Sequence, residues 1–210
     1  NEIQNVSLAS YIERMKEGQD KIYYVVADSF AAAKNSPHLE VFRKKGIEVL
    51  LMSDRIDEWL VSHLNEFDGK QLQSVTRGGL DLGDMDDAET KEAHEKLEKE
   101  FDTVVTRIKE SLKDKVKDVK LSHRLTDSPA CIVADDNDMS SQMAKLMASV
   151  GQEVPETLPI FEINGEHDLV KHIADEQDVQ ILLKAVCKTL LRLSLIHISF
   201  NDDVFKFPKV

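Results

Sequence analysis

Four apolar residues between positions 139 and 147 recur at the spacing of one helical face. They stand at offsets of 0, 4, 7 and 8 and are Met139, Met143, Leu146 and Met147. A methionine side chain is unbranched and polarizable, so a face rich in methionine adapts to many apolar partners. The spacing therefore predicts a surface that binds varied hydrophobic chains, and ordinary core filling is the alternative.

The expected helix has recognisable ends and follows a loop that is expected to be exposed. Asp138 or Asn137 is suited to cap its start, and Gly151 is suited to end it. The acidic run DDND that precedes the methionines indicates a solvated loop leading into the helix.

Trp59, the single tryptophan, is a second candidate contact. It follows Asp57 and Glu58 on a predicted helix whose core-facing stripe is expected to comprise Ile56, Leu60, Leu64 and Phe67. The helical rotation of about 100° per residue places Trp59 at the edge of that stripe. An indole offers a large apolar area with a polar handle, so Trp59 is a candidate for binding partner chains. A rim residue that covers the core is the alternative.

Motifs for nucleotide and metal chemistry are missing from the sequence. There is no GxxxxGK[ST] or GxGxxG, and Gly78-Gly79 alone does not form a phosphate cradle. His167 and His172 are five residues apart, which does not place two metal ligands on one helical face. We therefore expect this chain to bind no cofactor and no metal.

The polar residues His123, Arg124 and Asp127 do not make a catalytic triad by spacing. No serine stands in GxSxG, and the segment HRLTDSP lies between two predicted strands. We interpret it as a hydrogen-bonded hairpin turn.

Composition narrows the class of protein. The 210 residues are 41% hydrophobic and 31% charged, enough for one large or two small globular domains. The net charge of -12 argues against nucleic acid as a partner. Cys131 and Cys187 stand in apolar runs without metal-ligand spacing, which favours a reducing compartment, and we expect the cytoplasm. The start carries no signal-peptide pattern and no Met, so we expect a piece of a longer protein.

Apolar runs of strand length alternate with helical segments in the first third of the chain. Strands are expected near 22–27, 47–52 and 71–76, with helices between them. This order predicts an α/β fold, a small βαβ domain with helices on a mostly parallel sheet.

A change of pattern near residue 84 predicts a domain boundary. Residues 84–100 combine an acidic linker with the start of a long helix expected over 89–113. The apolar face of that helix is expected to consist of Leu97, Phe101, Val104, Val105, Ile108 and Leu112. Further strands are expected around 130–134 and 160–164, so residues 101–210 are predicted to form an α+β domain.

Several long motifs resemble the ninety-kilodalton heat-shock chaperone family, in particular its bacterial type. They are MKEGQDKIYY, NSPHLE, EFDGK and RLTDSPA, and the similarity covers about residues 6–178. The resemblance implies an ATP- and magnesium-dependent, homodimeric stress-response chaperone. In it, residues 1–83 would end the middle domain and residues 101–210 would belong to the C-terminal domain, which is of the dimerisation type. The ATPase domain would lie outside this chain, so the chain itself would not be an enzyme.

The resemblance also implies which residues contact client proteins. The matching positions are Glu58, Trp59 and Ser62 on one helix, and Met139, Met143, Leu146 and Met147 on another. The implied partners are unfolded or partly folded proteins, a second copy of the chain and co-chaperones.

The end of the chain departs from the family pattern after about residue 178. Lys184, Lys188 and Arg192 interrupt the apolar run there, which argues against a membrane span. The departure leaves open whether this piece dimerises.

Three hypotheses follow from the sequence. The first is a nonenzymatic part of a chaperone. The second is an α/β hydrolase acting on a nucleotide or phosphoester at the strand ends, near Asp28, Ser29, Ser53 and Asp54. The third is a structural dimerisation module with a dry methionine core.

Overall fold

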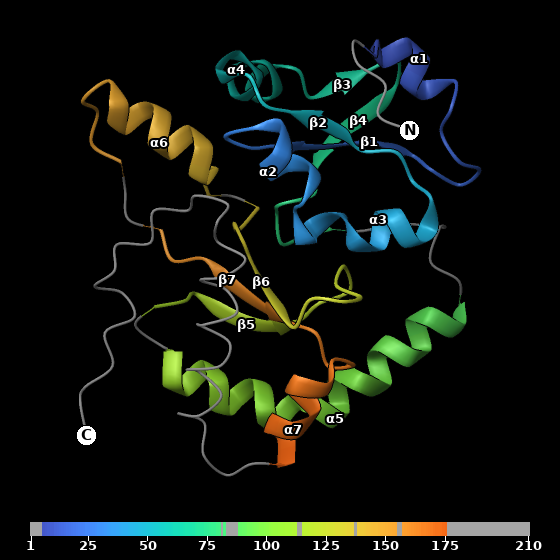
Figure 1. Cartoon of the computed structure of the whole chain (residues 1–210), viewed down its shortest axis with the longest axis vertical. Helices are drawn as coiled ribbons and strands as arrows, with labels where there is room; N and C mark the ends of the chain where they lie inside the picture. The colour runs from blue at the N-terminus through green and yellow to red at the C-terminus, as the bar shows by residue number, and fades with distance from the viewer. Residues whose placement is uncertain are drawn as a thin grey trace.

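The computed structural model of the chain describes residues 6–80, 82, 88–112, 115–136, 138–154 and 157–175. Two small sheets with helices packed against them make up the described part of the fold (Figure 1). The long helix α5 (Ala88–Leu112) stands between the first sheet and the second in the chain order. The domain limits expected from the sequence, at residues 83 and 101, stay a prediction.

The first sheet has four strands in the order β2-β1-β4-β3. They are β1 (Lys21–Val26), β2 (Leu50–Met52), β3 (Glu66–Phe67) and β4 (Lys70–Ser74). β1 pairs in parallel with β2 and with β4, so the three strands expected from the sequence are present and parallel. β2 is shorter than the apolar run that predicted it, and its residues are only partly buried.

Short helices complete this first part. They are α1 (Leu8–Ile12), α2 (Phe30–Lys34), the 3-10 turn η1 (Pro37–Leu39), α3 (Glu40–Lys45) and α4 (Arg55–His63). Pro37 stands at the start of its turn, where its missing N–H is not needed, and Gly46 ends α3 with a φ of 65°. The core beneath them joins Tyr23 and Phe42, whose ring centroids are 4.8 Å apart, to Val75.

The stripe predicted to face inward on α4 faces outward instead. Ile56 is 69% exposed, Leu60 45% and Phe67 37%, while Leu64 is partly buried. Phe67 is not on the helix at all, because the chain leaves the helix at Leu64 and Phe67 lies in β3. The β3–β4 hairpin turns at Asp68 and Gly69, both with positive φ. The helical period shows that residues share a face, but it does not show which side that face meets.

The second sheet has three strands in the order β5-β7-β6. They are β5 (Asp118–Leu121), β6 (Ala130–Val133) and β7 (Ile160–Ile163). β7 pairs in parallel with β5 and antiparallel with β6. The expected hairpin between β5 and β6 was therefore wrong, because β7 lies between the two strands and the segment HRLTDSP crosses over instead of turning back.

The long helix α5 packs along this sheet with the face that its sequence predicts. Phe101, Val104, Ile108 and Leu112 are buried, and Leu97 and Val105 are partly buried against the same core. α7 (Asp168–Asp175) contacts α5, and α6 (Ser141–Ser149) projects from the other end of the sheet toward α4 (Figure 1).

Candidate functional site

The outward face of α4 is an exposed apolar patch that includes Trp59. Ile56, Trp59 and Leu60 are 69%, 45% and 45% exposed and stand at positions i, i+3 and i+4 of the helix. His63 continues the face one turn on, and its ring stacks on the indole at a centroid distance of 6.4 Å. Large apolar side chains grouped on one exposed face are a feature of binding surfaces.

The Ser62 hydroxyl makes its hydrogen bonds within α4. It donates to the Trp59 carbonyl at 2.8 Å and lies 2.8 Å from His63 Nδ1. The Ser62 hydroxyl is thus bonded within its own helix. Its role as a contact for client proteins stays a prediction.

Glu58 differs from its neighbours, since it is only 9% exposed. Its carboxylate accepts a hydrogen bond from the hydroxyl of Ser140, at the start of α6. The resemblance implied Glu58 as a client contact, whereas the structure turns its carboxylate toward α6, and the implied contact stays a prediction.

The helix α6 begins and ends at defined residues. Ser140 is the N-cap, and its hydroxyl accepts from the Met143 amide at 3.0 Å. The prediction of Asp138 as the cap was wrong, and Asn137 lies outside the described residues. At the other end Gly151 has a φ of 77°, and the amides of Gly151 and Gln152 donate to the last turn, which confirms the predicted stop.

The four residues of the predicted apolar face are all partly buried. Met143, Leu146 and Met147 lie within α6, whereas Met139 precedes the cap and is therefore not part of the helical stripe. Val150 at the C-cap is 67% exposed. In the described part of α6 no side chain is fully buried, so its methionines are neither sealed in a core nor fully open.

The structure brings the two candidate helices together. Residues of α4 and α6 are in contact, and Figure 1 shows the two helices next to each other at one end of the first sheet. Glu58 reaches the cap of α6, and Lys145 within α6 forms an ion pair with Asp28 at 2.9 Å. Trp59 on α4 and the methionines of α6, Met143 and Met147, thus belong to neighbouring helices, although more than 80 residues separate them in the chain.

Arg77 holds the loop that leads into α6. Its guanidinium donates to the carbonyls of Asp135 at 3.2 Å, of Asp136 and of Asp138 at 3.0 Å. No sequence motif marked Arg77, because its three acceptors are backbone atoms about 60 positions away.

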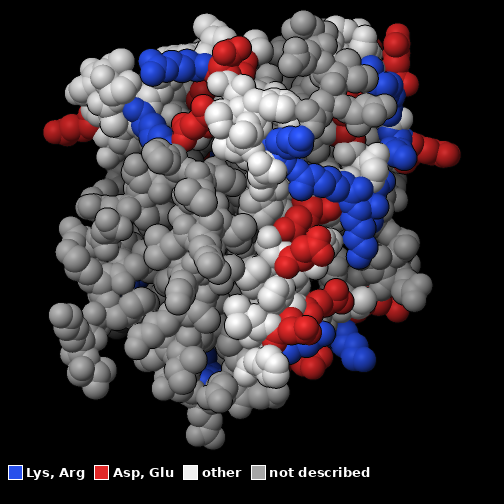
Figure 2. All heavy atoms as spheres, in the orientation of Figure 1, with Lys and Arg blue, Asp and Glu red and all other residues white. Residues whose placement is uncertain are grey.

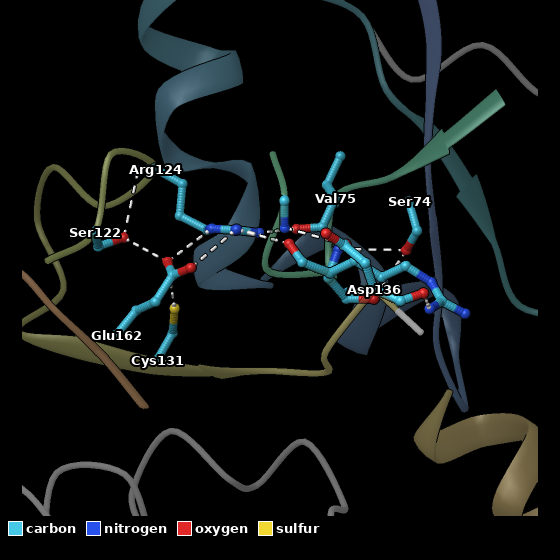
Figure 3. A network of polar contacts seen from close by, with 10 residues as sticks. Ser74, Val75, Ser122, Arg124, Cys131, Asp136 and Glu162 are labelled. Atoms are coloured by element: carbon cyan, nitrogen blue, oxygen red, sulfur yellow. Dashed lines mark hydrogen bonds and ion pairs between the residues drawn. The ribbon is translucent and has the colours of Figure 1, made fainter. Parts of the chain in front are cut away.

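A buried network joins the two sheets behind this loop (Figure 3). Arg124, only 2% exposed, donates from Nε and Nη2 to the Glu162 carboxylate at 2.9 and 3.0 Å. It also donates to the carbonyls of Val75 and Arg77, the latter at 2.7 Å. Arg124 therefore ties the end of β4 to the middle of β7, which is a structural role and not that of a hairpin turn.

Two further side chains of the first part face the same junction. Glu40 accepts from the amides of Thr126, Asp127 and Ser128 at 2.7, 2.9 and 3.1 Å. Partial burial raises the pKa of Glu40, but these bonds and that of the Ser128 hydroxyl outweigh it and lower the pKa overall. Burial, together with the charge of Arg124, lowers the pKa of His38 to about 3.

The residues of the hydrolase hypothesis follow the carboxyl ends of the neighbouring strands β1 and β2. Val26 pairs with Met52, so the two strands end at the same side of the sheet, as expected. The described contacts of these residues are structural. Ser29 caps α2 by accepting from Ala32, Asp28 pairs with Lys145, and Asp54 precedes α4, where its amide donates to Asp57 at 2.8 Å.

Gly78 and Gly79 do not fit a nucleotide phosphate. The Gly78 amide donates to Ala134 at 2.9 Å and the Gly79 amide to the Asp136 carboxylate at 3.1 Å. Both donors are thus occupied, and an acidic side chain stands where a phosphate would bind.

Other sites can be judged only for the described part of the chain. There, no group of three or more His, Cys, Asp or Glu side chains is arranged to hold a metal ion. None of the helices described is both long enough and apolar enough to cross a membrane. Figure 2 shows acidic and basic side chains interspersed on one face. Burial and the nearby Glu162 carboxylate raise the pKa of the Cys131 thiol, and Cys187 lies outside the described residues.

Comparison with known proteins identifies the family. A sequence model described as Hsp90 protein matches residues 1–208. The chain belongs to the Hsp90 family, as the resemblance predicted. The match also includes the segment after about residue 178 that we had set apart, and that segment lies outside the described residues.

Similar curated proteins carry the name chaperone protein HtpG. The protein of Colwellia psychrerythraea is 91% identical over 175 residues, which are 83% of this chain and 27% of that protein. Those of Pseudoalteromonas translucida and Vibrio parahaemolyticus are 70% and 62% identical, each over 83% of this chain and 28% of the relative. The chain thus spans little more than a quarter of the length of these relatives.

Proposed function

We propose that this chain is part of a molecular chaperone and binds unfolded or partly folded proteins through two neighbouring helices. The observation that carries the proposal is the exposed face of Ile56, Trp59 and Leu60 on α4, a helix that contacts the methionine helix α6 elsewhere, through Glu58 and Ser140. Such a surface binds by burying apolar area of the client, and methionine lets it fit clients of different shape.

The predicted site residues have two different roles in client binding, direct contact and support of the helices. Trp59, Met143, Leu146 and Met147 would touch the client, together with Ile56 and Leu60, which the sequence interpretation had assigned to the core. Met139 would add a contact just before the helix. Glu58 and Ser62 would support the helices, because their polar atoms are bonded within the protein.

The test compares client binding by two matched variants. Fluorescence anisotropy of a labelled, carboxymethylated lactalbumin measures affinity for a permanently unfolded client. Met143→Glu/Met147→Glu places charge on the α6 face, and Leu158→Glu makes the same kind of change at an apolar residue that is 44% exposed outside both helices. Losing about 1 kcal/mol of apolar burial at each methionine weakens binding by roughly 30-fold, whereas Leu158→Glu is expected to bind as the parent does.

The same double variant separates the proposal from a dimerisation module with a dry methionine core. In that case both charges would enter a core, and far-UV circular dichroism would show loss of structure. Retained structure with lost binding supports the client surface. Equal binding by the parent and the double variant contradicts it.

We further propose that the whole protein is a homodimer that hydrolyses ATP with magnesium outside this chain, and that it acts with co-chaperones in the cytoplasm. Family membership supports this, and the occupied Gly78 and Gly79 amides offer ATP no cradle here. Sedimentation of the chain with and without the residues after 178 tests its own contribution to dimerisation. Turnover of a phosphoester that is lost in Asp54→Ala would instead favour the hydrolase.

A further inference from the structure

The position of α6 depends on polar contacts more than on packing. Residues of the apolar core clusters come from the strands, from other helices and from connecting segments, and none of them belongs to the described part of α6. Polar contacts tie α6 and its preceding loop to the first part of the chain. Those described include Glu58 to Ser140, Asp28 to Lys145, Arg77 to the carbonyls of residues 135, 136 and 138, and the Gly79 amide to the Asp136 carboxylate.

Among the side chains that make these contacts, Glu58 is the most buried. Lys145 and Asp28 have side chains that are 36% and 43% exposed, so water and salt screen their ion pair. Glu58 is 9% exposed, and a carboxylate at that depth needs a hydrogen-bond donor. The donor that the structure provides is the Ser140 hydroxyl.

The Ser140 hydroxyl therefore has two functions at once. Its oxygen accepts from the Met143 amide at 3.0 Å, which caps α6, while its proton is donated to Glu58 on α4. The first turn of the methionine helix and the helix that bears Trp59 are thus connected through one side-chain oxygen.

We propose that Glu58 is a positioning residue that holds α6 against α4 and thereby limits how far the methionine face opens. In the held position Met143, Leu146 and Met147 are partly buried. When Glu58 releases Ser140, α6 moves away from α4 and these side chains become more accessible. The effect on clients rests on the proposed function, but the movement of α6 does not.

Variants at both ends of the contact separate tethering from capping. Ser140→Asp keeps an oxygen that can cap α6 but places a second carboxylate opposite Glu58, so the tether breaks while the cap remains. Ser140→Thr keeps both the cap and the donor and is the matched control. Glu58→Ala removes the acceptor, and Glu58→Gln restores an acceptor oxygen without charge.

Oxidation by hydrogen peroxide, followed by mass spectrometry of the 210-residue chain, measures the exposure of each methionine. Met15 follows α1, far from α6 in sequence, and is also partly buried, so it serves as the internal reference. We expect Ser140→Asp and Glu58→Ala to raise the oxidation rates of Met143 and Met147 several-fold relative to Met15. Ser140→Thr and Glu58→Gln are expected to stay near the parent. A simple loss of folding would raise the Met15 rate as well.

Unchanged Met143 and Met147 rates in Glu58→Ala overturn the proposal, whatever happens to Ser140→Asp. Client anisotropy on the same samples distinguishes this failure from failure of the proposed function. If oxidation rises and client affinity stays constant, the tether is supported and the client surface is not. If oxidation is unchanged while Met143→Glu/Met147→Glu abolishes client binding, the client surface is supported and the tether is wrong.

Discussion

Replacing Arg124 by methionine tests whether the buried junction stabilises the fold. The substitution removes five N–H donors and keeps much of the apolar stem. Glu162, 4% exposed, loses its bidentate partner and keeps the Ser122 hydroxyl at 2.8 Å, while the Val75 and Arg77 carbonyls lose the donors shown in Figure 3. Breaking one side of a buried ion pair costs about 3–5 kcal/mol, so we expect a loss of about 4 kcal/mol.

Urea titration followed by far-UV circular dichroism at pH 7 measures this loss. Arg14→Met is the matched control, because Arg14 makes the same bidentate contact with Glu48, at 2.9 and 2.7 Å, on the surface. Water already solvates that pair, so we expect its midpoint to stay within error of the parent. Arg124→Lys keeps the charge but lacks the planar fork, and it should fall between the two. Equal midpoints for Arg124→Met and Arg14→Met would refute the reasoning.

The remaining predictions concern pH and the loop before α6. Because the pKa of His38 falls from 6.5 to about 3 on folding, the unfolded chain binds a proton that the folded chain excludes, and stability drops as pH falls through that window. Urea titrations should show that the free energy of unfolding of the parent is about 2 kcal/mol lower at pH 5 than at pH 7, and that His38→Gln lacks this decrease. An equal decrease in the parent and the variant would contradict the role of His38. Glu40, whose pKa is lowered, should stabilise the loop above its ordinary pKa of 4.5 and less below it, so amide exchange at residues 126–128 should accelerate in Glu40→Gln at pH 7. Slow amide exchange at residues 126–128 in Glu40→Gln would contradict the stabilisation of this loop by the Glu40 carboxylate. Gly79→Ala would place a Cβ 2.0 Å from an Asp136 carboxylate oxygen, so Asp136 must move. Faster Met143 oxidation is then expected, and an unchanged rate would show that this loop does not position α6.

Features written into local sequence were predicted well. The apolar face of α5, the positions of strands β1, β2 and β4, and the glycine that ends α6 follow from periodicity and backbone conformation. Each depends on residues within a few positions of one another, whereas the parallel pairing was predicted from the alternation of strands with helices. Family resemblance then indicated the Hsp90 family, to which the chain belongs, and pointed to the same two helices as the residue spacing.

Features decided by distant contacts were missed. The period of Ile56 and Leu60 fitted a buried face equally well, and only the tertiary packing shows that this face is outward. Asp138 and Ser140 are both good caps, and in the structure the one that also bonds Glu58 is the N-cap. The insertion of β7 between β5 and β6 depends on a strand about 30 residues further on, which no turn signal reveals.

The shared guanidinium of Arg124 makes the two halves of the chain depend on each other. It satisfies carbonyls of one half and a carboxylate of the other with a single planar group. If the chain were cut in the acidic stretch near residue 84, one fragment would keep the arginine with its carboxylate, and the other would keep two carbonyls without their donor. The halves should therefore melt together in one cooperative transition, and each should be less stable alone than when joined.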